Sequence, residues 1–127
     1  MAAPNIVNVN TITGVVTFVS NINTQQGGMS VIASNPAASG KVLKINTLTA
    51  AGIGATCSVT VKLFNQAAGA GTSVGLGHTL SVPKFSTLAV ITKENSIYVQ
   101  EDQSIAAFKQ ANTGGSIDII CSYEDIS

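Results

Sequence analysis

Apolar and polar residues alternate along the two clearest segments of the chain. In residues 57–63 every odd position is apolar and every even position is polar. Residues 117–124 repeat this arrangement, although Ile120 interrupts the polar set. Because successive side chains of a strand point to opposite sides of a sheet, the period of two predicts β-strands with one buried face and one face in water. Ile120 indicates that the last strand is covered on its second face too.

These two strands predict individual core positions. Val59, Val61, Ile117 and Ile119 are expected to be almost fully buried, so that truncating any of them to alanine costs about 2–4 kcal/mol. Thr60 is expected to lie on the wet face, where a substitution should matter much less.

The other strands are inferred from short runs rich in Val, Ile and Thr that lie between turn-forming residues. No long stretch has the apolar period near 3.6 of a helix, so helix content should be minimal. The further strands are expected near residues 5–10, 14–20, 29–34, 41–50, 73–82, 86–93, 96–100 and 104–110. About ten short strands predict an all-β fold, a single antiparallel β-sandwich of jelly-roll or Ig-like type.

The first twenty residues differ in composition from the rest of the chain. Asparagine-rich residues 5–10 precede Gly14, which is expected to mark a β-bulge or the end of an arm. Residues 1–20 are therefore predicted to be an amino-terminal strand or arm, and residues 21–127 the β-sandwich, within one domain overall. Such a segment either pairs with the sheet edge of a neighbouring copy or forms a plain edge strand of its own domain.

Charge is scarce in this chain of 127 residues. Only 9% of the residues are charged and 45% are hydrophobic, and the formal net charge is zero. An ordinary soluble domain has about 25% charged residues. Because little electrostatic repulsion keeps copies apart, we expect part of the surface to be covered by partners and the chain to form a homo-oligomer.

The few charges are segregated along the sequence. Residues 1–93 contain five lysines and no acid, whereas residues 94–127 contain six acids and Lys109. Either neighbouring strands pair these charges within the fold, or the subunit has unlike faces suited to head-to-tail contact. The zero net charge and the lack of arginine argue against a nucleic-acid partner. No apolar run approaches the length of a membrane span.

Histidine and cysteine offer little chemistry. His78 is the only histidine, and Cys57 and Cys121 are the only cysteines and lack CxxC spacing. Neither a catalytic dyad nor a zinc site is expected from so few ligands. Both thiols are expected to face the interior, and they would form a disulfide only if their strands are adjacent with suitable geometry.

Two acidic pairs are the remaining candidate metal ligands. Glu101-Asp102 and Glu124-Asp125 would chelate calcium only if the turn and the carboxy terminus met. A solvated turn and a solvated tail are expected instead. No catalytic, cofactor-binding or metal-binding residue is predicted, and no enzymatic activity is expected.

Aromatic residues are also few. The chain has no Trp and four Phe, of which Phe18, Phe64 and Phe108 are expected to be packing residues.

From Lys41 onward the chain resembles the small β-sandwich structural proteins of tailed bacteriophages, including virion proteins of marine cyanobacterial phages. The resemblance is carried by Lys41-Val-Leu-Lys-Ile-Asn-Thr-Leu, Ser81-Val-Pro-Lys-Phe-Ser-Thr-Leu-Ala-Val, Ser96-Ile-Tyr-Val-Gln-Glu-Asp-Gln-Ser-Ile and Ser122-Tyr-Glu-Asp-Ile. It implies a virion component without enzymatic activity, assembled in the host cytoplasm.

Within that resemblance, the expected function is to decorate or cement a phage capsid through contacts with other virion proteins such as a major capsid protein. A trimer is favoured, because the local threefold positions of a capsid suit that symmetry. The alternative is a tail, neck or fibre module that recognises a host surface through two glycine-rich loops, Gly69 to Gly77 and Asn112 to Ser116.

Overall fold

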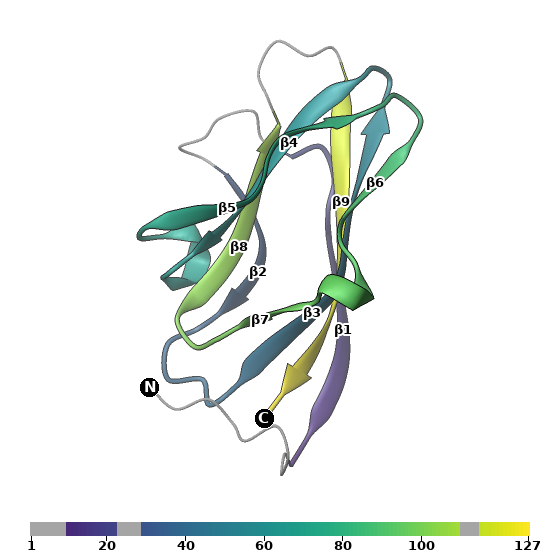
Figure 1. Cartoon of the computed structure of the whole chain (residues 1–127). Coiled ribbons are helices and arrows are strands. Elements are labelled where there is room, and N and C mark those ends of the chain that lie inside the picture. The colour runs from purple at the N-terminus through teal and green to yellow at the C-terminus, as the bar shows by residue number, and fades with distance from the viewer. Residues whose placement is uncertain (1–9, 23–28, 110–114) are drawn as a thin grey trace.

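The computed structural model of the chain describes residues 10–22, 29–109 and 115–127. Within these residues it contains nine β-strands, two 3₁₀-helices and no α-helix (Figure 1). The strands are β1 (Ile12–Val19), β2 (Ser30–Asn35), β3 (Val42–Ile53), β4 (Cys57–Phe64), β5 (Ser73–Val82), β6 (Thr87–Ile91), β7 (Ile97–Val99), β8 (Gln103–Lys109) and β9 (Ser116–Ile126). The 3₁₀-helices are η2 (Ala67–Gly69) and η3 (Lys93–Asn95).

Two antiparallel sheets pack against each other as a sandwich (Figure 1). Sheet A has the strand order β1-β9-β3-β6, and β7 pairs with β3 on the same edge as β6. Sheet B has the order β2-β8-β4-β5. β6 and β7 follow each other along the same edge of β3 and are interrupted only by η3, so together they fill one strand position of the sheet. The sandwich then has eight strand positions, and their connectivity is that of a jelly roll. The predicted all-β antiparallel sandwich is confirmed, and of its two expected types the jelly roll is the one observed.

The predicted strands agree closely with the observed ones from β1 to β9. The strand expected near residues 5–10 lies outside the described residues. Residues 12–19 of the predicted amino-terminal strand or arm form β1, which pairs with β9 along its whole length. The expectation of a bulge or arm end at Gly14 was wrong, because Gly14 lies opposite Glu124 within an unbroken register.

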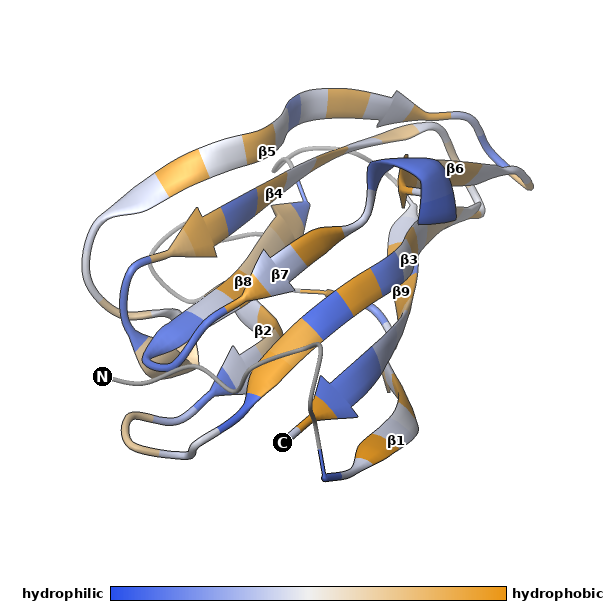
Figure 2. Cartoon of the chain, turned by 60° about the horizontal axis from the view of Figure 1, so that its bottom comes forward, coloured by the Kyte–Doolittle hydropathy of each residue, from blue (hydrophilic) through white to orange (hydrophobic). Residues whose placement is uncertain are grey.

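The core lies between the two sheets and is built from alternate residues of their strands. Val59, Val61, Ile117 and Ile119 are all fully buried, as the period of two predicts. Figure 2 shows the same alternation of hydrophobic and hydrophilic residues along β3. Within the described residues, no helix is long and apolar enough to cross a membrane.

A bulge part-way along β3 shifts the buried positions from odd to even residue numbers. Ile45 lies opposite Tyr123 and Thr47 lies opposite Ser122, so Asn46 is the extra residue. Before the bulge the odd position Ile45 is buried, and after it the even position Leu48 is buried. A simple alternation therefore describes each half of β3 but not the whole strand.

The outer face of sheet B is partly covered, which corrects the expectation for Thr60. This residue is only 2% exposed, and its Oγ1 accepts a hydrogen bond of 2.9 Å from the backbone N–H of Thr79 in β5. On the neighbouring β8, Ser104 is fully buried beneath η2, where its Oγ accepts the N–H of Gly69. A strand that alternates in sequence thus lacks a fully wet face because other segments fold over it.

Candidate assembly surfaces

The residues with catalytic or metal-binding potential do not come together. His78 is exposed on β5. The described residues contain no group of three or more His, Cys, Asp and Glu side chains that could hold a metal ion. The two acidic pairs are separate: Asp125 forms an ion pair of 3.2 Å with Lys41, whereas Asp102 Oδ1 accepts the N–H of Ala67.

Both cysteines are free and buried. Cys57 lies in sheet B and Cys121 in sheet A, and both side chains face the core as predicted. Burial raises the pKa of the Cys121 thiol from its ordinary 9.0 to about 11, and a hydrogen bond with Thr17 opposes part of that rise. Because the thiolate is the reactive form, Cys121 is inert near neutral pH.

The raised pKa of Cys121 predicts a loss of stability in alkali. Below pH 9 the thiol is protonated in both folded and unfolded chains; between pH 9 and about 11 only the unfolded chain ionises. The free energy of unfolding should therefore fall by about 2 kcal/mol across this window. Denaturant melts at several pH values should show a smaller fall for Cys121→Ala. Burial also raises the pKa of Tyr123, so the variant should keep a smaller fall of its own. Equal slopes for the two proteins would contradict the prediction.

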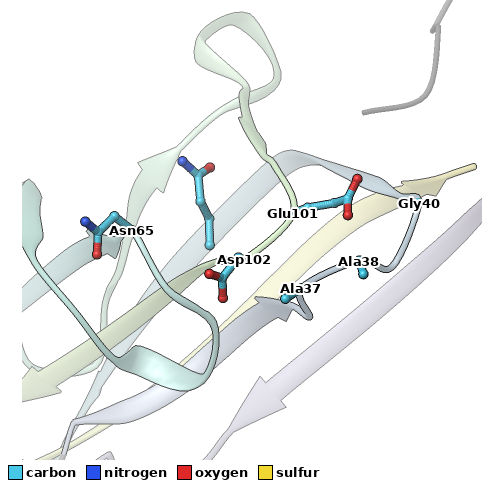
Figure 3. Close-up of a pocket in the computed structure, with 7 residues that line it drawn as sticks. Ala37, Ala38, Gly40, Asn65, Glu101 and Asp102 are labelled. Carbon is cyan, nitrogen blue, oxygen red and sulfur yellow. The ribbon is translucent and has the colours of Figure 1, made fainter. Parts of the chain in front are cut away.

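A hollow of about 620 Å³ opens at one end of the sandwich (Figure 3). Its walls come from the connections between β2 and β3, β4 and β5, and β7 and β8. The lining residues are Ala37, Ala38, Gly40, Asn65, Glu101, Asp102 and Gln103. The surface of this hollow is therefore apolar on the alanine side and acidic on the opposite side.

Three hydrogen bonds hold the wall that contains η2. Asp102 Oδ1 accepts the N–H of Ala67, Ser34 Oγ accepts that of Ala68, and Ser104 Oγ accepts that of Gly69. Glu101 is only 3% exposed, and none of the described residues hydrogen-bonds or ion-pairs with its carboxylate. Because no buried side-chain oxygen of the described residues lacks a hydrogen-bond partner, the carboxylate oxygens of Glu101 reach the solvent of the hollow, where a cationic partner could contact them.

A strip of apolar side chains lies on the outer face of sheet A. Phe18 of β1 and Ile120 of β9 are directly opposite each other and are 76% and 52% exposed. Val16 and Ile12 lie on the same face of β1 and are also exposed. We call these four residues the apolar strip. The expectations that Phe18 packs inside and that Ile120 is covered were wrong for the isolated subunit, because no described segment lies over this face.

An exposed corner joins β5 to β6 at the end opposite the hollow. Phe85 is 78% exposed, and the Lys84 Nζ lies 5.9 Å from the centre of its ring. The corner passes close to β3, where a Cβ on Gly52 would lie 2.7 Å from the carbonyl oxygen of Pro83. Glycine at this position therefore permits the close approach. We call these two side chains the Lys84–Phe85 corner.

The segregated charges meet partly within the subunit. Besides the Lys41–Asp125 ion pair, Lys44 of β3 lies directly opposite Glu124 of β9. Pairing between neighbouring strands therefore accounts for these four charges.

Of the two glycine-rich loops, the structure describes the first in full and the second only in part. The first begins at η2, beside the hollow, and runs into β5. Residues 112–114 of the second lie outside the described residues.

The comparisons with known proteins rest on structure alone. No family model matches the chain, and no curated protein is similar to it in sequence. The fold is similar to that of a chain in the solved structure described as "Bacillus endospore appendages form a novel family of disulfide-linked pili". The TM-score is 0.53 at 13% identity, over 92% of this chain and 87% of that chain. At this identity the similarity shows a shared β-sandwich fold.

Sequence reasoning missed the most distinctive surfaces. Neither the Lys84–Phe85 corner nor the hollow with its alanines was predicted from the sequence. An aromatic residue directly after a proline turn is a usable signal for Phe85, because such a corner is placed at the surface. The hollow leaves no comparable signal, since its walls come from three separate connections.

Proposed function

We propose that this chain is a non-enzymatic structural subunit that assembles with copies of itself. The observation that carries the proposal is the apolar strip beside the outer edge of β1. Phe18 and Ile120 expose large apolar areas on a sheet face, and no described strand pairs with that edge. An open edge flanked by exposed apolar side chains favours association with another chain.

Two further facts support assembly over catalysis. The described residues lack a metal cluster, and the only histidine is exposed and far from any partner set. The similar fold occurs in a structure described as pili, which are polymers of subunits. The low charge of the chain allows close packing of copies with little repulsion.

The contacts between copies should be noncovalent. The chain has two cysteines, and both are buried in the core of one subunit. Neither thiol reaches the surface to bridge two copies, in contrast to the disulfide links named for the similar structure. Assembled material should therefore run as a monomer on a denaturing gel without reductant, and reductant should not change its sedimentation. Dissociation by reductant alone would contradict this.

Sedimentation of the purified chain over a range of concentrations tests the proposal directly. Self-association should appear as species larger than the monomer, and Phe18→Ser with Ile120→Ser should weaken it. Val74→Ser is a suitable control, because Val74 is exposed on β5 of the other sheet. A monomer at every concentration would refute the proposal.

A phage particle is the proposed location of this subunit. The sequence resemblance and the jelly-roll fold, which viral capsid proteins also use, support a role in decorating or cementing a capsid. A closed trimer is the expected assembly there and should sediment as one discrete species. Mass spectrometry of purified particles should detect the chain in many copies. Its absence from the particles would remove this part of the proposal.

A further inference from the structure

We propose that copies of this chain join end to end, with the Lys84–Phe85 corner of one copy seated in the hollow of the next. This inference rests on the proposed self-assembly and names one interface within it. The occupant of the hollow is then a second copy of the chain. The aromatic ring would contact the alanine side of the hollow, and the ammonium group would face its carboxylates.

The two surfaces lie at opposite ends of the subunit, as end-to-end joining requires (Figure 1). The corner is attached beside Gly52, near the last residue of β3, whereas Gly40 of the hollow lies just before its first residue. A strand rises about 3.3 Å per residue, so the ten steps from Val42 to Gly52 separate the two surfaces by roughly 30 Å. One subunit therefore cannot fill its own hollow.

Backbone hydrogen bonds hold the corner in place. The N–H of Phe85 donates to the carbonyl of Gly52, and the N–H of Gly52 donates to the carbonyl of Ser86, both at 2.9 Å. The N–H of Lys84 donates to Thr56 Oγ1 at 3.3 Å. A corner tied in this way loses little conformational entropy on binding, which favours association.

Two features of the corner are energetically unfavourable in the isolated subunit. Phe85 has a φ of +57°, a backbone conformation that is uncommon for a bulky residue, and its ring is exposed to water. The ring is close enough to the Lys84 ammonium for a cation–π contact, so the two groups are presented together. Burying the ring against another copy would recover the hydrophobic free energy that exposure forgoes.

The hollow matches this corner in chemistry. Ala37 and Ala38 supply apolar lining, and Glu101 and Asp102 supply carboxyl groups to the same hollow (Figure 3). The carboxylate of Glu101 reaches the hollow without a hydrogen-bond or ion-pair partner among the described residues, so it would attract a positive charge there. The ammonium of Lys84 from another copy supplies that charge. A volume of about 620 Å³ is within the range of roughly 300–1,000 Å³ for sites that enclose small organic ligands, so a phenyl ring and a lysine side chain fit.

An interface between unlike surfaces is heterologous, and it produces an open filament unless its rotation closes a ring. The closed trimer proposed above is the case in which three copies close such a ring, and its covalent ladder would then end at three copies. Lys84 lies at one end, and the carboxyl groups of Glu101 and Asp102 line the hollow at the other, where the nearby Lys41 is already paired with Asp125. Complementary ends also favour one orientation of the copies, because like ends would bring like charges together.

Phe85→Ala tests the interface, with Val74→Ala as the control, because Val74 is exposed on β5 and belongs neither to the apolar strip nor to the hollow. Phe85→Ala and Lys84→Glu should each raise the concentration needed for assembly by tenfold or more. Ala37→Trp should act similarly by filling the hollow, whereas Ala37→Ser should not. Ala37 is exposed in a loop, so both variants should keep the fold. Circular dichroism checks that they do.

Cross-linking gives a direct readout of the contact. In an Ala37→Cys, Ser86→Cys variant, a short bismaleimide should join neighbouring copies into a ladder of covalent oligomers, because the native thiols are buried and these two sites are at opposite ends. An Ala37→Cys, Asn95→Cys variant should give no such ladder, because Asn95 is exposed but belongs to none of the proposed contact surfaces. If the wild-type chain assembles but the first variant yields no ladder and Phe85→Ala assembles normally, the end-to-end interface is wrong and self-assembly stands. A wild-type chain that stays monomeric refutes the self-assembly itself. Calcium binding to the hollow without any effect of Lys84→Glu on assembly would also overturn the inference.

Discussion

Ile119→Ala is expected to lower the free energy of unfolding by about 2–4 kcal/mol. Ile119 is fully buried in the core cluster between the two sheets, so truncation removes buried methyl groups and leaves a cavity that the surrounding strands fill only in part. Equilibrium denaturation with urea measures the change.

The adjacent residue provides the control for this prediction. Ile120 is on the opposite face of β9 and is 52% exposed, so Ile120→Ala should change the stability of the monomer by about 0.5 kcal/mol or less. Because Ile120 belongs to the apolar strip, the same substitution should instead weaken self-association. Equal losses of stability for the two variants would show that the assigned faces of β9 are wrong.

Asn35→Ala is expected to destabilise the fold by about 2–4 kcal/mol, although the residue removed is polar. Asn35 is fully buried; its Nδ2 donates to the carbonyls of Lys41 and Val99 at 2.9 and 3.1 Å. Its Oδ1 accepts the hydroxyl of Ser39 at 2.6 Å. Alanine at this position would leave carbonyl groups without partners in a buried environment, where the loss costs more than a hydrogen bond contributes in water.

Asn95→Ala is a matched control, because Asn95 is exposed and its side chain makes a single long contact of 3.5 Å with Thr92. Its effect on the unfolding free energy should be about 0.5 kcal/mol or less. Asn35 also connects the end of β2 to the start of β3 and to β7, beside the hollow. Comparable melts for the two asparagine variants would mean that this connection contributes little.

Local pattern was enough to predict the strands and the centre of the core. Alternation in residues 57–63 and 117–124 identified β4 and β9 and the buried positions at their centres, because the period of side chains along a strand is a local property. The turn-forming residues located the boundaries between strands, because turn preferences are also a local property. The bulge at Asn46 was also detectable in principle, since Leu48 comes three positions after Ile45, whereas strict alternation would place the next apolar residue two positions later.

The alternation along a strand could not predict whether its outward-pointing side chains are covered. Thr60 and Ile120 both occupy outward positions in strands that alternate, yet Thr60 is covered and Ile120 is exposed. The difference depends on whether a distant segment folds over the strand. For Thr60 that segment is part of β5, whose N–H at Thr79 reaches its hydroxyl.

The sequence by itself therefore determined the all-β class, the positions of the described strands, the inward direction of both thiols and the scarcity of charge. Only the tertiary structure decided the jelly-roll order of the strands, the exposure of the apolar strip, and the placement of the Lys84–Phe85 corner and the hollow at opposite ends. The physical reason is the range of the interactions. Strand period and turn chemistry act between neighbours in sequence, whereas the hollow is formed by three connections that meet only after the two sheets have packed together.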